Sequence, residues 1–129
     1  MEFKKFSAGT TSYGTGQQPP EKQLSNVCFF DPKLNTDIKN IATGNDLHKV
    51  MVFLAACHTI IVDEKKGTYN AASPDELALV HFAKQFGYIF KGKDLDDNML
   101  IEEKGLGSAP KSIRMKVLHV CEFSSARKR

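Results

Sequence analysis

The chain contains two stretches in which apolar residues recur every three or four positions, which is the spacing of one face of a helix. Asn45 or Thr43 can cap the first stretch, and residues 57–59 close it. Its apolar positions are Leu47, Val50, Met51, Leu54 and Ala55. This stripe indicates a helix that packs against a core rather than one that lines a cofactor pocket.

The second stretch begins at a well-marked helix boundary. Ser73 is a good N-cap, Pro74 suits the first helical position, and Glu76 at the third position predicts a capping box with Ser73. Gly87 is placed for a left-handed C-cap. The apolar side consists mainly of Leu77, Val80, Phe82 and Phe86. We therefore expect a helix of about four turns.

Short alternating and β-branched runs predict about six strands. They lie at residues 1–6 with a return strand at 10–14, and at 60–62, 88–90, 99–102 and 113–123. The last run is the longest, and it begins with strict alternation of apolar and basic side chains. Two helices among short strands predict an α+β fold, in which helices pack on one side of an antiparallel sheet of about six strands.

The segment between the first strands and the first helix is less clearly patterned. Residues 14–25 are polar, contain Pro19-Pro20, and are predicted to form a linker or mobile loop. Asp31-Pro32 stops a short apolar run and indicates a turn or the start of a helical turn. Residues 38–43 are ambiguous between helix and loop.

The bulk composition is that of one ordinary globular domain. The 129 residues are 41% hydrophobic and 26% charged, which argues against both disorder and a second domain. The net charge of +3 is scattered except at Arg127-Lys128-Arg129, so it does not indicate nucleic-acid binding. The longest apolar run, residues 50–57, is far short of the roughly 20 residues that cross a bilayer.

The cysteines and histidines do not form a metal-binding pattern. Cys28, Cys57 and Cys121 are odd in number and widely spaced, which indicates buried thiols in a reducing compartment. The adjacent pair Cys57-His58 points in different directions, and neither it nor His119-x-Cys121 forms the C-x-x-C pattern of a zinc site. We interpret His58 as a structural residue satisfied near the end of its helix.

The stretch Tyr69-Asn70-Ala71-Ala72-Ser73-Pro74-Asp75-Glu76-Leu77-Ala78-Leu79-Val80 resembles a motif in the nucleotide-binding domain of type IV P-type ATPases, the lipid flippases. Three further segments are similar to that family, in the family's order. They are the start of the chain through Gly14, the segment Leu54–Thr59, and Glu122-Phe123-Ser124-Ser125-Ala126-Arg127-Lys128-Arg129. The resemblance covers most of the chain.

The resemblance implies an ATP-binding role for four residues. Glu76 would contact the adenine end of ATP, Phe123 would stack on adenine, and Ser125 and Lys128 would line the pocket towards the phosphates. The residue pattern alone allows other interpretations. Glu76 could only cap its own helix, Phe123 could be a core residue at a strand end, and Lys128 could be a solvated terminal charge.

The resemblance also implies where the chain sits in a larger protein. It would be a partial nucleotide-binding domain, with residues 1–13 as a hinge strand region, 14–25 as a mobile loop and 26–129 as the domain body. The phosphorylated aspartate, a later Lys-Gly-Ala motif and membrane helices do not occur in it. We therefore expect a cytoplasmic domain of an integral membrane protein that holds ATP, contains no catalytic residue and no metal ligand, and is inactive alone.

In that setting the chain would present the γ-phosphate of ATP to an aspartate outside it. Mg²⁺ would be bound mainly by the phosphorylation domain. The implied partners are the phosphorylation and actuator domains of the same protein and an accessory subunit, and the transported phospholipid would be chosen in the membrane region.

Two alternatives follow from the residues. The chain could be a non-catalytic interaction module that binds a protein or lipid partner through the basic tail from Arg127 and the loop from Gly14. A small independent enzyme is disfavoured, because no nucleophile, base and orienting group stand in a catalytic pattern.

Overall fold

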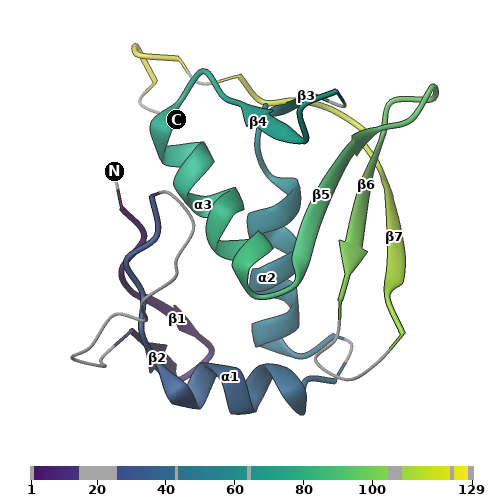
Figure 1. Cartoon of the computed structure of the whole chain (residues 1–129). Coiled ribbons are helices and arrows are strands. Elements are labelled where there is room, and N and C mark those ends of the chain that lie inside the picture. Colours follow the sequence, from purple (N-terminus) through teal and green to yellow (C-terminus); the bar gives the residue numbers. More distant parts are fainter. Residues whose placement is uncertain are drawn as a thin grey trace.

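A computed structural model describes residues 2–14, 26–42, 44–63, 65–104, 109–122 and 124–127. Within these ranges, three helices and seven strands follow one another along the chain (Figure 1). They are β1 Phe6–Ala8, β2 Thr11–Tyr13, α1 Pro32–Lys39, α2 Asp46–Ala56, β3 Ile61–Asp63, β4 Thr68–Asn70, α3 Pro74–Gln85, β5 Tyr88–Lys93, β6 Asn98–Glu103 and β7 Lys111–Lys116. The pairs formed by these strands are antiparallel, which confirms the predicted α+β fold.

The strands are divided among three small sheets rather than joined in one. Strands β1 and β2 form one hairpin, β3 and β4 form a second, and β5, β6 and β7 form a three-stranded sheet in that order. Helices α2 and α3 pack against each other and against the inner face of this sheet, at the centre of the molecule in Figure 1. Each strand of the two hairpins is three residues long, whereas β5, β6 and β7 have six residues each.

Helix α3 begins and ends where local chemistry predicts. The Ser73 hydroxyl accepts a hydrogen bond from the Asp75 N–H at 3.3 Å, and Pro74 occupies the first turn. Gly87 follows the helix with φ of +93°, and its N–H donates to the Lys84 carbonyl at 3.1 Å. A Cβ at position 87 would lie 2.5 Å from the Lys104 carbonyl oxygen, so this close approach of two chain segments requires glycine.

The second half of α3 is held by a group of aromatic rings, called here the aromatic cluster. Its members are Phe3, Phe6, Tyr13, Phe29, Phe82 and Phe86. The Phe82 side chain is completely buried, and its ring stacks on Phe3 with 3.9 Å between centroids. The aromatic cluster therefore joins the β1–β2 hairpin and the segment before α1 to the central helix.

Helix α1 was not anticipated beyond a possible first turn. Its N-cap Asp31 is buried, and the carboxylate accepts hydrogen bonds from Lys33 N–H at 2.9 Å and Gly14 N–H at 2.8 Å. Leu34 and Ile38 are buried on its inner side. An eight-residue helix is marginal alone, so tertiary contacts stabilise it more than its own sequence does. Residues 15–25 of the predicted mobile loop lie outside the described residues.

Strand β7 is shorter than the predicted strand of residues 113–123. It ends at Lys116, which pairs with Asn98, the first residue of β6. The pairing of β7 stops at Lys116 because β6 begins at Asn98, so within the described ranges no partner strand is present beyond that point. The hydrophobic pattern of the later residues does not change this. The prediction of a strand over residues 117–122 is wrong, and the Leu118 side chain is 86% exposed.

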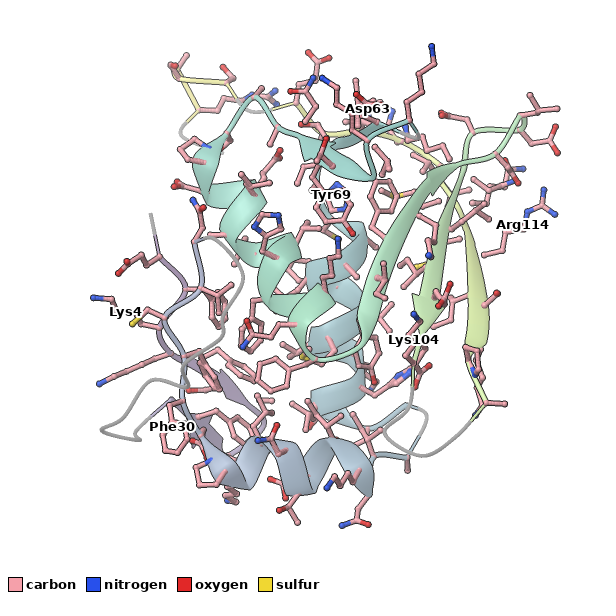
Figure 2. The ribbon with its side chains drawn as sticks, in the orientation of Figure 1. Lys4, Phe30, Asp63, Tyr69, Lys104 and Arg114 are labelled. Carbon is pink, nitrogen blue, oxygen red and sulfur yellow. The ribbon has the colours of Figure 1, made fainter. Side chains whose placement is uncertain are left out.

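The β3–β4 hairpin is attached to the core through Tyr69. Its hydroxyl donates a hydrogen bond to the Phe90 carbonyl at 2.9 Å, and its ring lies 5.7 Å from that of His81 (Figure 2). Burial raises the pKa of Tyr69 to about 12, so the phenol remains a hydrogen-bond donor at neutral pH. The hairpin is therefore fixed beside the ends of α2 and β5.

Candidate functional site

A cavity of about 410 Å³ lies where the end of α2, the start of α3 and the end of β5 meet, and it is called here the Glu76 cavity. The chain after β7, yellow in Figure 1, runs past the β3–β4 hairpin towards the first turn of α3. The residues that line the cavity are Ala56, Cys57, His58, Thr59, Glu76, Lys93, Met99, Val117, His119, Val120 and Cys121. Its size is within the usual range of small-molecule pockets.

The Glu76 carboxylate is oriented by the segment that follows α2. Its Oε2 atom accepts hydrogen bonds from the Thr59 hydroxyl at 2.9 Å and from the Thr59 N–H at 3.3 Å. The interpretation that Glu76 only caps its own helix is therefore wrong. Two donors from one residue hold the carboxylate at the wall of the cavity, where it can accept a hydrogen bond from a ligand.

His58 supports this arrangement as a hydrogen-bonded structural residue, which confirms its sequence interpretation. Its Nε2 atom donates to the Ala55 carbonyl at 2.8 Å, and its Nδ1 atom accepts from the Ile60 N–H at 3.1 Å. These bonds require the neutral ring, since a charged ring would place a second N–H against the Ile60 N–H. Burial lowers the pKa of His58, which further favours the neutral form.

The two charged residues of the cavity act on His58 in opposite directions. After burial and the hydrogen bond to Ala55, the Glu76 carboxylate raises the pKa of His58 and the Lys93 ammonium lowers it. Glu76 and Lys93 thus border the same imidazole. A ligand in the cavity would meet an acceptor on one wall and a positive charge on another.

The sequence did not single out Lys93, because the predicted strand ended at residue 90. It is the last residue of β5, and its Nζ atom lies 3.1 Å from Asp97 Oδ1 in the β5–β6 turn. That turn is held by the Asp94 carboxylate, which accepts from the Asn98 N–H at 2.9 Å. The signal that could have found Lys93 is Gly92, because a glycine inside a strand often marks a bulge.

A second cavity of about 510 Å³ adjoins the first. Of the residues that the structure describes, His58, Thr59, Lys93 and Val120 line both cavities. The rest of its lining is mainly apolar and comes from β3 and β5. The two hollows together offer room for a ligand longer than a single ring system.

Of the other three predicted binding residues, the structure describes Ser125. Phe123 and Lys128 lie outside the described residues. Ser125 is exposed in a turn in which the Arg127 N–H donates to the Ser124 carbonyl at 3.1 Å, and it does not line the Glu76 cavity. Of the two predicted residues that the structure describes, Glu76 is the one at the cavity.

The described part of the chain contains neither a cluster of metal ligands nor a membrane-crossing helix. No group of three or more His, Cys, Asp or Glu side chains there is arranged to hold a metal ion. Cys28, Cys57 and Cys121 are free thiols, but Cys28 is half-buried and the other two are exposed, so the expectation of buried thiols is wrong. None of the helices in these ranges has the length and apolar character needed to cross a bilayer.

Comparison with known proteins identifies relatives along the full chain, although no family model matches it. The chain is 39% identical to the mouse phospholipid-transporting ATPase IK, with all of this chain and 10% of the relative aligned. It is 36% identical to the Arabidopsis thaliana probable phospholipid-transporting ATPase 7, over 92% of this chain and 10% of the relative. The Xenopus tropicalis phospholipid-transporting ATPase IC is 33% identical over the whole chain and 11% of its own length.

The chain is homologous to a segment of phospholipid-transporting ATPases. It spans about a tenth of the length of the relatives it matches. The motifs that carried the resemblance include Glu76, and Glu76 is also the predicted residue that the fold places in a cavity. The motif resemblance and the geometry therefore concern the same end of α3.

Proposed function

We propose that this chain is part of the nucleotide-binding domain of a phospholipid-translocating P-type ATPase and that it binds ATP in the Glu76 cavity. The observation that carries the proposal is the Glu76 carboxylate, which two hydrogen bonds from Thr59 hold at the wall of a hollow of suitable size. Carboxylates in this position are suited to the amino group of adenine, which is a donor without a charge.

The lining of the cavity suits the flat, largely apolar face of a base. Met99, Val117 and Val120 contribute apolar side chains to the wall, while Glu76 supplies the acceptor. Phe123 would stack on the adenine ring, as in the family that the motif resembles. Ser125 and Lys128 would then lie towards the phosphates, so the adenine end would be buried and the phosphate end would face outwards.

The affinity expected from these contacts is low. Stacking of a base on an aromatic ring contributes about 1–3 kcal/mol, and the hydrogen bond to Glu76 adds about 1 kcal/mol. An exposed lysine facing a phosphate adds at most about 1 kcal/mol. Such a sum corresponds to a dissociation constant near the millimolar range.

In the whole protein, this segment would hold ATP and present the γ-phosphate to a phosphorylation-site aspartate outside the chain. Residues 1–13 would act as the hinge strand region, and residues 26–129 as the domain body. As the resemblance implies, Mg²⁺ would be held mainly by the phosphorylation domain. Phospholipid movement would further require the actuator and membrane parts, with an accessory subunit as a partner.

Replacement of Glu76 by Gln tests the proposal. We expect Glu76→Gln to weaken ATP binding about fivefold in a calorimetric titration, because the amide is a poorer acceptor and its NH₂ group repels the adenine amino group. Asp75→Asn is the matched control, since Asp75 is exposed in the same turn, loses the same charge and does not line the cavity. Equal ATP affinity of the Glu76→Gln and wild-type proteins, or an equal loss in both variants, would contradict an adenine contact at Glu76.

A second candidate is a non-catalytic module that binds a protein or lipid partner. It is favoured by the exposure of apolar side chains near the cavity, which include Ile61, Leu118 and Val120. Saturable binding of ATP that shifts the Glu76 amide would argue against it. Resonances of residues 118–120 that respond to lipid vesicles and not to ATP would favour it.

A further inference from the structure

Strand β5 contains a β-bulge that changes the direction of its last side chain. Phe90 pairs with Ile101 and Gly92 pairs with Leu100, so Lys91 is an extra residue between two consecutive pairs. Gly92 has φ of +108°, in a region that side-chain-bearing residues rarely adopt. Bulges of this kind turn a side chain towards a new face and recur beside functional sites.

The bulge places Lys93 on the inner face of the sheet. Lys93 pairs with Met99, which is buried and lines the Glu76 cavity. In an unbroken strand Lys93 would share the outer face with Lys91, whose Nζ atom lies 3.3 Å from Glu102 Oε2. Arg114 projects from that outer face, away from the helices, in Figure 2.

Within the described ranges, the ion pair of Lys93 is a weak one at the surface. The Lys93 ammonium lies 3.1 Å from Asp97, and the two side chains are 41% and 72% exposed. Surface pairs of this kind contribute little to stability, so folding alone does not explain a bulge that turns a lysine inwards. A ligand with two or more negative charges can compete with Asp97 for the ammonium.

We propose that Lys93 binds the phosphate chain of the nucleotide, exchanging Asp97 for the phosphates when ATP enters the Glu76 cavity. This inference rests on the proposed function and adds a phosphate-binding residue to it. Lys93 lines both the Glu76 cavity and the adjoining one, so its ammonium can reach a phosphate chain that extends from an adenine bound near Glu76. Lys91 is two positions before Lys93 in β5, but its side chain lies on the opposite face of the sheet.

Parallel titrations with adenosine and ATP test this role. The full chain is compared with Lys93→Gln, Lys91→Gln and Asp97→Asn, with amide chemical shifts as the readout. We expect Lys93→Gln to weaken ATP binding about fivefold and to leave adenosine binding unchanged, because adenosine has no phosphate. Lys91→Gln should change neither. Asp97→Asn should tighten ATP binding about twofold, and Asn tolerates the φ of +62° at position 97.

Other results of these titrations would overturn either the role of Lys93 or the proposed function. Unchanged ATP affinity in Lys93→Gln overturns the inference, and so does an equal loss of adenosine affinity, which would indicate a structural role. Wild-type protein that binds adenosine as tightly as ATP also overturns it, while leaving the adenine site intact. Wild-type protein that binds neither ligand overturns the proposed function, and the inference with it.

Discussion

Helix α3 connects two regions that are stabilised in different ways. Its second half carries the buried Phe82, and Phe86 at its C-cap packs against Phe82 in the aromatic cluster. Its first turn carries Glu76, which is half-buried and held by polar contacts at a cavity. This difference indicates that packing in the aromatic cluster fixes the position of α3. The first turn of α3 can therefore present the Glu76 carboxylate to the cavity without contributing to the stability of the fold.

The largest effect is expected from Phe82→Ala, which removes the centre of the aromatic cluster. Phe82 is fully buried and contacts Phe3, Phe6, Phe29 and Phe86. The free energy of unfolding should fall by about 3–5 kcal/mol, since a large cavity replaces the ring. Urea unfolding measures this loss. Phe82→Leu, which keeps most of the volume, should lose much less, and equal losses in both variants would contradict the packing role.

A smaller effect, on binding rather than on stability, is expected from Thr59→Val. The variant keeps the shape of Thr59 but loses the hydroxyl that donates to Glu76 Oε2 at 2.9 Å. Stability should fall by less than about 1 kcal/mol, because Thr59 is exposed, whereas ATP affinity should fall about threefold as the carboxylate loses its orientation. Thr59→Ser should restore the affinity. Failure of the serine variant to do so would assign the effect to the methyl group instead.

The smallest expected effect is the contribution of His58 to the pH dependence of the free energy of unfolding. Because burial holds the pKa of His58 below 6.5, the unfolded chain binds a proton more readily than the folded one. The stability due to the neutral ring is complete above pH 6.5 and is lost as the pH falls below it. Urea unfolding between pH 7 and 5 should therefore show a decline that is shallower in His58→Asn, whose side-chain oxygen can still accept from the Ile60 N–H.

The sequence was most informative where structure depends on neighbouring residues. Asn45 caps α2 by accepting from the Leu47 N–H, and Ser73 and Gly87 bound α3, all as local rules predict. The end of β7 could not be predicted in this way, because Asn98 of another strand sets it. Local helix propensity also underestimates the length of α1, because this helix depends on the buried carboxylate of Asp31.

The candidate site shows the same limit. The motif singles out Glu76, which the fold places at a cavity, but its partner Thr59 lies 17 positions earlier and no short-range pattern links them. Lys93 was hidden because a single extra residue in β5 reverses which face it occupies. A one-residue slip in a strand moves every later side chain to the opposite face, so the alternation rule misplaces residues beyond a bulge.

The most direct test of the nucleotide site is an NMR titration of the chain with ATP, with and without Mg²⁺, to about 10 mM, well above the expected millimolar dissociation constant. We expect saturable shifts at the amides of residues 57–60, 76 and 93, with residues of the aromatic cluster unchanged. Phe123→Ala should abolish the shifts. Shifts spread evenly over both regions, or none at all at the highest concentration, would contradict an ATP site at the Glu76 cavity.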